Sequence, residues 1–126
     1  MQNLVKSIMT QKLNKGEVWL ANLNPTKGTE PGKTRPVLIL QDQSLLDVMH
    51  PSTLIVPLTT KLIQDTYPLR VRINAKDRLE KNSDLLIDQI RAIDNKRFAQ
   101  GPLTTLTNMQ LESVYEAVCE VMGMKL

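Results

Sequence analysis

The sequence has little of the residue types on which metal sites, disulfides and nucleophilic catalysis usually depend. Its 126 residues include a single cysteine, Cys119, and a single histidine, His50. These two residues cannot supply an intramolecular disulfide or the ligands of a structural zinc site. The sequence also lacks a nucleophile-elbow motif and a phosphate-cradling Gly-rich loop that opens a helix. We therefore interpret Cys119 as a packing residue and His50 as an exposed loop residue. Any bond cleavage would depend on Arg, Lys, Thr, Asp or Glu.

Aromatic residues and long apolar runs are scarce as well. One Trp, two Tyr and one Phe are few stacking platforms for a single-strand-binding protein. No stretch approaches a membrane span, and the N-terminus lacks the apolar core of a secretory signal, so a cytoplasmic location is expected. The net charge of +3 permits a nucleic-acid partner without requiring one.

The hydrophobic pattern predicts several short strands followed by one helix. Strands are expected at 16–23, 36–41, 53–58 and 69–74, one strand or a pair of strands at 84–93, and a short helical turn or excursion within 43–50. Pro57 indicates an edge strand or a bulge. The C-terminal helix has a capping box of Thr107 with Gln110, and Gly123 marks its end. This order favours a mainly β fold with flanking α-helices (α+β), a small curved antiparallel sheet or partly open barrel. Residues 1–14 are expected to be a peripheral extension of a single domain at 15–126.

The stretch from Asn24 to Leu40 carries the strongest chemical signal. A loop rich in Gly, Pro, Lys and Thr leads into an apolar strand, and Pro36 favours an extended backbone at Arg35. A guanidinium at the base of such a loop suits a phosphate, and Thr59 offers a hydroxyl at the end of a strand. With Glu30 or Asp88 as proton acceptor, these groups suit metal-free RNA cleavage by the ribose 2′-OH. Taken singly, each has an ordinary structural explanation, which stays open here.

Two further patterns concern charged residues within strands. Arg70 and Arg72 alternate with apolar residues and predict a solvated strand face, with RNA contact as the lesser alternative. Asp88 falls on the apolar side of its segment, which indicates a bulge or a strand end. Gln89 and Arg91 share one face if the strand period of two continues through them.

Three segments carry a family resemblance: GEVWLANLNPTKGTEPGKTRPVLIL, IVPLTTK and LLIDQIRAID. Together and in this order they resemble the MazF/PemK toxins of type II toxin–antitoxin systems. The resemblance implies an SH3-like barrel with flanking helices and a homodimer. It also implies a metal-independent endoribonuclease without a cofactor, which cuts single-stranded RNA at short sequences. A cognate antitoxin would neutralise it through a flexible tail that occupies the RNA groove.

By motif position, the resemblance assigns Arg35 and Thr59 to the family's catalytic arginine and threonine, and Glu30 to an acid implicated in some members. PemK-like members have a histidine where this chain has Thr29, and an arginine where it has Leu86. Their mechanism with the aspartate as base therefore fits this chain less well than the Arg/Thr mechanism. The residues expected to bind substrate are Thr29, Lys33, Thr60, Lys61, Asp88, Gln89 and Arg91.

Two alternatives remain at this point. The gyrase-poisoning CcdB toxins share the fold without being nucleases, but their terminal helix ends in Trp-Gly-Ile, whereas this chain ends in VMGMKL. A nonenzymatic module that binds RNA or protein on the same barrel is the other alternative.

Overall fold

A computed structural model describes residues 12–23 and 33–125 of the chain. Within them the strands are β1 (Glu17–Asn22), β2 (Thr34–Ile39), β3 (Ser52–Thr59), β4 (Arg70–Ile73), β5 (Ser83–Leu86), β6 (Arg91–Asp94) and β7 (Phe98–Thr105). The helical elements are α2 (Gln43–Asp47), α3 (Asn108–Met122) and the short 3₁₀ turns η1 (Ile87–Gln89) and η2 (Asn95–Arg97). None of the helices in these residues is long and apolar enough to cross a membrane.

Strand β3 lies at the centre of the antiparallel sheet. The strand order is β4-β5-β3-β2-β1-β7, and β6 pairs with β3 beside this path. One edge of β3 pairs with β2, while its other edge pairs first with β6 and then, from Leu58, with β5. The expectation that Pro57 marks an edge strand is therefore wrong. Pro57 lies opposite Val37, close to where the neighbour changes from β6 to β5, and an interrupted ladder tolerates a residue without an N–H.

The sheet curves into a partly open barrel. It is not closed because β4 and β7, at the two ends of the strand order, are not paired with each other. The connection from β4 to β5 reaches across to β7. The Arg78 N–H donates to the Leu103 carbonyl at 2.9 Å, and the Thr104 hydroxyl donates to the Asp77 carboxylate at 2.8 Å. The predicted class, a mainly β fold with flanking helices, is confirmed.

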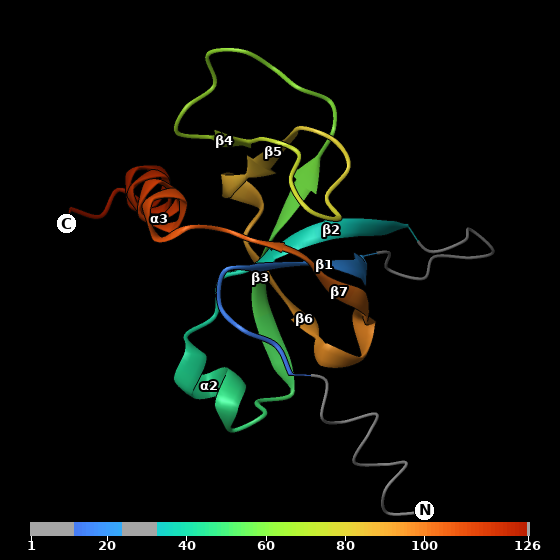
Figure 1. Cartoon of the computed structure of the whole chain (residues 1–126). Coiled ribbons are helices and arrows are strands. Elements are labelled where there is room, and N and C mark those ends of the chain that lie inside the picture. Colours follow the sequence, from blue (N-terminus) through green and yellow to red (C-terminus); the bar gives the residue numbers. More distant parts are fainter. Residues whose placement is uncertain (1–11, 24–32, 126) are drawn as a thin grey trace, which may run out of the picture.

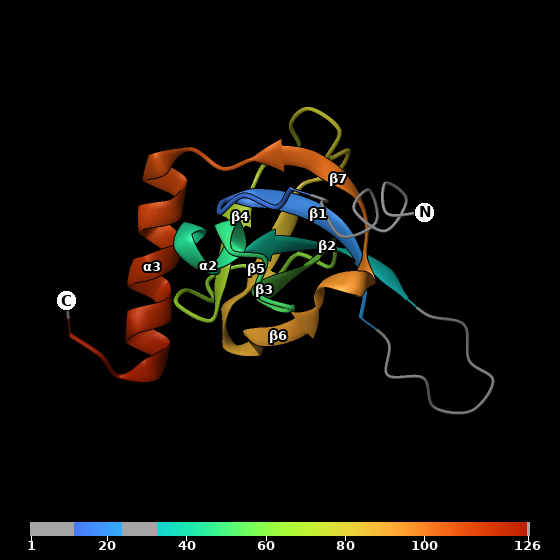
Figure 2. The same cartoon turned by 90° about the horizontal axis from the view of Figure 1, so that it is seen from below.

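Apolar side chains are buried on both faces of the sheet. Val18 and Leu38 belong to a core that α3 covers with Val114, which we call the α3 core. The neighbouring residues Trp19 and Val37 point to a second core, the Trp19 core, which also contains Leu13, Ile55 and Phe98. Because both faces are covered, β2 reads as a continuous apolar run instead of an alternating one. Figure 1 and Figure 2 show α3 along one side of the sheet, and Figure 1 shows α2 beside the lower end of β3. Leu13 is buried although it falls within the expected extension.

Helix α3 begins and ends where the sequence predicts. The Thr107 hydroxyl accepts from the Gln110 N–H at 3.1 Å, and the Gln110 side chain accepts from the Thr107 N–H at 2.8 Å. Gly123 follows the helix with a φ of 70°, a left-handed conformation that favours glycine. The helix buries Val114 and Ala117, so its sheet-facing side is held by packing as well as by caps.

Strand β7 is not among the strands that the sequence predicts. It contains Gly101 and Pro102, a pair that is typical of a turn. The structure explains the glycine: a Cβ atom at Gly101 would lie 2.3 Å from Cδ2 of Trp19. The indole of a neighbouring strand, not a turn, requires glycine at this position.

We expect Gly101→Ala to destabilise the protein by about 1–3 kcal/mol, because the added methyl group overlaps the Trp19 ring and the core must shift. Urea unfolding followed by circular dichroism measures the change. The neighbouring Gln100→Ala, at an exposed position of β7, is the control and should change stability by less than about 0.5 kcal/mol. Equal stability of Gly101→Ala and the wild type would show that Trp19 does not impose the glycine.

Candidate active site

The two residues that the sequence predicts to be catalytic lie on the neighbouring strands β2 and β3, near the ends that adjoin. The register pairs Ile39 with Ile55 and ends with Val37 opposite Pro57. Arg35 and Thr59 each lie two residues beyond this last pair, so by the strand period of two they belong to the same face of the sheet as Val37 and Pro57. Arg35 lies inside β2, which begins at Thr34, instead of preceding the strand as the sequence suggested.

Both residues lie where the Trp19 core ends. Arg35 follows the alternation of Val37 and Ile39, which are buried in that core, and Thr59 follows that of Ile55. Arg35 and Thr59 are each half-buried, so this face changes from apolar to polar at their position. Within the described part of the chain, the side chain of Arg35 forms no hydrogen bond or ion pair.

The Thr59 hydroxyl is oriented by its own strand end. The Lys61 N–H donates to Oγ1 of Thr59 at 3.2 Å, which closes a tight turn directly after β3. This contact occupies an acceptor position of the hydroxyl and leaves its O–H to donate. The geometry suits a hydrogen bond to a phosphate oxygen better than proton abstraction.

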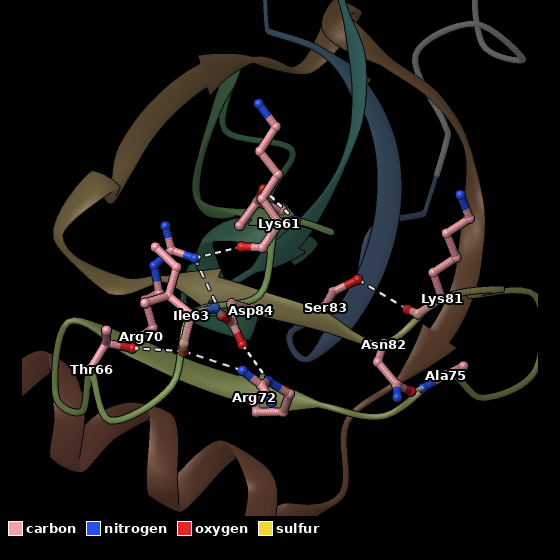
Figure 3. Close-up of polar contacts among 11 residues, drawn as sticks. Lys61, Ile63, Thr66, Arg70, Arg72, Ala75, Lys81, Asn82, Ser83 and Asp84 are labelled. Atoms are coloured by element: carbon pink, nitrogen blue, oxygen red, sulfur yellow. Dashed lines mark hydrogen bonds and ion pairs between the residues drawn. The ribbon is translucent and has the colours of Figure 1, made fainter.

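The same cross-strand row continues from Thr59 into a buried charge network. Thr59 pairs with Asp84 of β5, and Asp84 pairs with Arg72 of β4. The Asp84 side chain is 1% exposed and accepts from Nε of Arg72 at 2.7 Å and from Nη1 of Arg70 at 3.3 Å. Figure 3 shows both guanidinium groups converging on this carboxylate. The prediction that Arg70 and Arg72 form a solvated face holds only in part: Arg72 is exposed and Arg70 half-buried, but both bind the buried Asp84.

Hydrogen bonding determines the charge state of this network. Burial alone would raise the pKa of Asp84, but hydrogen bonds from Arg72, from the Ile63 N–H and from Arg70 outweigh it and hold the pKa below its ordinary value. The hydrogen bond to Asp84 also raises the pKa of Arg72. Asp84 is therefore an anion at neutral pH. Because its lowered pKa makes it a weak proton acceptor, it is a poor candidate for a general base.

Sequence reasoning did not select Asp84. Its signal was present as a carboxylate between Ser83 and the apolar residues that follow, in a strand whose four residues are all buried. A buried carboxylate needs a cationic partner. Arg70 and Arg72 were the available partners, but the pairing of β4 with β5 was not deducible from local pattern.

The remaining predicted site residues lie in different places. Lys33, Thr60 and Lys61 are exposed and flank the pair at the strand ends. Asp88 and Gln89 are exposed in η1, whereas Arg91 begins β6 opposite Ile55, about 13 Å along β3 from Thr59. Thr29 and Glu30 lie outside the described residues.

The structure contradicts one prediction for the segment of Asp88, Gln89 and Arg91 and agrees with another. Gln89 and Arg91 do not share a strand, so the expected period of two fails there because η1 interrupts it. Asp88 lies in η1, two residues after β5 ends at Leu86, which agrees with its predicted position at a strand end.

An open pocket of about 600 Å³ lies beside the strand ends. Its walls include Pro36 and Thr60, the chain neighbours of Arg35 and Thr59, together with Gln100 and the segment from Asp77 to Lys81. The lining contains both acidic and basic side chains, which provide donors and acceptors for a polar ligand.

Comparison with known proteins places this arrangement in a family. Residues 14–122 match the family described as PemK-like, MazF-like toxin of type II toxin-antitoxin system. The chain belongs to this family. It is 31% identical over 113 residues to the endoribonuclease MazF of Staphylococcus saprophyticus, which covers 89% of this chain and 92% of that protein.

Solved structures of PemK/MazF toxins share the fold. The Mycobacterium tuberculosis toxin MazF-mt6 superposes with a TM-score of 0.72 at 20% identity and covers 87% of this chain and 99% of its own. A MazE-MazF structure from Deinococcus radiodurans gives a TM-score of 0.73 at 24% identity, with coverage of 90% and 98%. The family resemblance and fold class inferred from the sequence are thus confirmed.

The lowered pKa of Asp84 predicts a specific acid sensitivity. A carboxylate whose pKa is lower in the folded than in the unfolded state contributes stability above its ordinary value of 3.8, and this contribution is lost as pH falls below it. Between about pH 6 and about pH 3, the free energy of unfolding should fall more steeply for the wild type than for Asp84→Asn. Urea unfolding at each pH measures both slopes. Asp88→Asn, the same change at an exposed residue, should keep the wild-type slope; equal slopes for wild type and Asp84→Asn would contradict this prediction.

Proposed function

We propose that this protein is a toxin endoribonuclease that cleaves single-stranded RNA, in particular mRNA, at specific short sequences and without a metal ion. It acts in the cytoplasm and blocks translation and growth until an antitoxin neutralises it. The observation that carries the proposal is the position of Arg35 and Thr59, which lie two residues beyond the last pair of the β2–β3 ladder and belong to the same face of the sheet. Membership of the PemK/MazF toxin family and the likeness to a named endoribonuclease support it.

The proposed reaction uses the RNA's own nucleophile. The ribose 2′-OH attacks the adjacent phosphorus while the bond to the 5′-oxygen of the next nucleotide breaks, which yields a 2′,3′-cyclic phosphate and a 5′-OH. The planar donors of Arg35 bind the phosphorane oxygens, where negative charge develops. Thr59 donates a hydrogen bond to a phosphate oxygen and orients the group, in agreement with its turn to Lys61.

The proton of the 2′-OH needs an acceptor, and we propose Glu30, the carboxylate in the segment before Arg35. Asp84 is unsuited because its two oxygens are occupied by cationic and amide donors. Asp88 lies in η1, and the mechanism with this aspartate as base fits the chain less well because Thr29 and Leu86 stand where PemK-like members have a histidine and an arginine. Arg35 can also donate the proton that the leaving 5′-oxygen requires.

Substrate contacts beyond the reacting phosphate are proposed around the strand ends. Lys33 and Lys61 offer cations to neighbouring phosphates, and Thr60 lines the pocket in which a flanking base could lie. Thr29, Asp88, Gln89 and Arg91 remain proposed contacts of a longer RNA segment. Arg91 shares the face of Thr59 through its pairing with Ile55.

We further propose that the chain forms a homodimer and binds a MazE-like antitoxin across the RNA site. Support comes from family membership and from related structures that are described as MazE-MazF or as an endoribonuclease with its cognate antitoxin. A flexible acidic segment is the kind of ligand that would compete with RNA for Arg35 and the neighbouring lysines.

Incubation of the protein with a long single-stranded RNA in EDTA tests the proposed reaction. We expect cleavage products with 5′-OH ends, and a rate that falls by at least about a hundredfold in Arg35→Ala and in Thr59→Ala. Sequencing of the 5′-OH ends identifies the cleavage sites. DNA of the same sequence should stay intact because it lacks the 2′-OH.

Thr105→Ala is the matched control, since this exposed threonine ends β7 as Thr59 ends β3, and it should leave the rate unchanged. Intact RNA under every condition would exclude the nuclease, and RNA binding without cleavage would favour the nonenzymatic module. Full activity of both site variants would remove the two assigned roles while leaving the fold assignment intact.

A further inference from the structure

Asp84 is the one charged residue among the buried polar residues of the described structure, and its carboxylate is bound by two arginines of β4 and by an N–H of the segment that follows Thr59. Its Oδ1 accepts from Nε of Arg72 at 2.7 Å. Its Oδ2 accepts from Nη1 of Arg70 at 3.3 Å and from the Ile63 N–H at 3.1 Å. A carboxylate this deeply buried is costly unless it is paired, so its position is defined by these three donors.

Each arginine also reaches a carbonyl of the same segment. Nη1 of Arg70 donates to the Lys61 carbonyl at 2.8 Å, and Nη2 of Arg72 donates to the Ile63 carbonyl at 3.2 Å. Figure 3 shows how these contacts join Lys61 and Ile63 to the two arginines and Asp84. The loop after β3 is thereby tied to β4 and β5 through side chains.

The network ends on the proposed catalytic hydroxyl. The Lys61 carbonyl is held by Arg70, and the N–H of the same residue donates to Oγ1 of Thr59 at 3.2 Å. A continuous chain of contacts therefore runs from Asp84 through Arg70 and Lys61 to Thr59. Without the Asp84 carboxylate, Arg70 would lose the partner that keeps its guanidinium hydrogen-bonded to the Lys61 carbonyl.

We propose that Asp84 is a positioning residue for RNA cleavage, which uses Arg70 and Arg72 to fix the Thr59–Ile63 segment and so orients the Thr59 hydroxyl. This inference rests on the proposed function, and it adds a residue that acts through Thr59 without touching RNA. Small displacements of a catalytic group reduce rates strongly even when binding persists. The expected signature is thus a loss in turnover and not in affinity.

The charges of the network make this signature sharper. Two guanidinium groups and one carboxylate carry a net charge of +1, and removal of the carboxylate charge raises it to +2. The arginines are partly exposed, with side chains at 20% and 34% exposure, on the face that carries Thr59. Asp84→Asn should therefore attract the RNA backbone more strongly while it positions Thr59 less well.

The test compares wild type, Asp84→Asn, Thr59→Ala and the double variant on one RNA in single-turnover and steady-state assays. We expect Asp84→Asn to lower kcat about tenfold without raising KM, but to lower the residual rate of Thr59→Ala by less than about threefold. Glu112→Gln, an exposed carboxylate on α3, makes the same change in net charge and should leave kcat unchanged. Circular dichroism confirms that each variant is folded at the assay temperature.

A second variant keeps the test decisive if Asp84→Asn fails to fold. Arg72→Gln leaves Asp84 bound to Arg70 and Ile63 but removes the contact to the Ile63 carbonyl, so kcat should fall about threefold with the same dependence on Thr59. Hydrogen exchange gives a readout without RNA: the Ile63 amide should be protected in the wild type and exchange faster in Asp84→Asn.

Unchanged kcat in Asp84→Asn, a raised KM, or an equal loss with and without Thr59 would overturn the positioning role. A wild-type protein that does not cleave RNA would instead reject the proposed function, and the exchange of Ile63 would still show whether Asp84 holds the loop.

Discussion

Strand β3 pairs with three other strands, and the positions of the site residues depend on this pairing. On one edge its register with β2 ends at Val37 and Pro57, with Arg35 and Thr59 two residues beyond this pair. On the other edge the change of neighbour from β6 to β5 sets Asp84 beside Thr59. A slip of one residue in either ladder would turn these side chains to the opposite face. The apolar residues of β3, buried in both cores, prevent such a slip.

The site lies where a buried face of the sheet meets solvent. Where this face belongs to the Trp19 core, its side chains are apolar and packed. Outside that core, the side chains on the same face are polar or charged. This placement holds the backbone of Arg35 within β2 while its side chain is half-buried. It also explains why Asp84 can be buried: the loop after β3 covers it, while Arg70 and Arg72 neutralise it. Burying the charges of Asp84 and its arginines costs desolvation free energy, so stability alone would not favour the network. Its contacts instead specify one conformation of the loop.

Several parts of this structure were predictable because their signals are local. The capping box at Thr107 and the stop at Gly123 define α3 without reference to the rest of the chain. The strands around Trp19, Val37 and Ile55 were identified from apolar runs, although their bounds shifted by one or two residues. Arg35 and Thr59 were selected from a loop composition, a strand end and a family pattern, and the structure has them near the ends of the neighbouring strands β2 and β3.

Other parts were not predictable because their cause lies in a distant strand. Strand β7 was missed because a Gly-Pro pair is typical of a turn. The contact of Gly101 with the Trp19 ring, which requires the glycine, is not visible in the sequence. Pro57 suggested an edge strand or a bulge because the change of partner along β3 is invisible in the sequence. Arg70 and Arg72 were interpreted as a solvated face because alternation reports which side a residue lies on, but not which carboxylate it meets there.

By itself, the sequence determined the mainly β class, the C-terminal helix, the family and the residues with suitable chemistry. These follow from local periodicity, from capping and from motifs read in order. Only the tertiary structure decided which of those residues meet. The burial of Asp84, its two arginine partners and its connection to Thr59 arise from pairing between strands far apart in the chain. The physical reason is that hydrogen-bond register and burial are nonlocal, and they become visible only when the sheet is assembled.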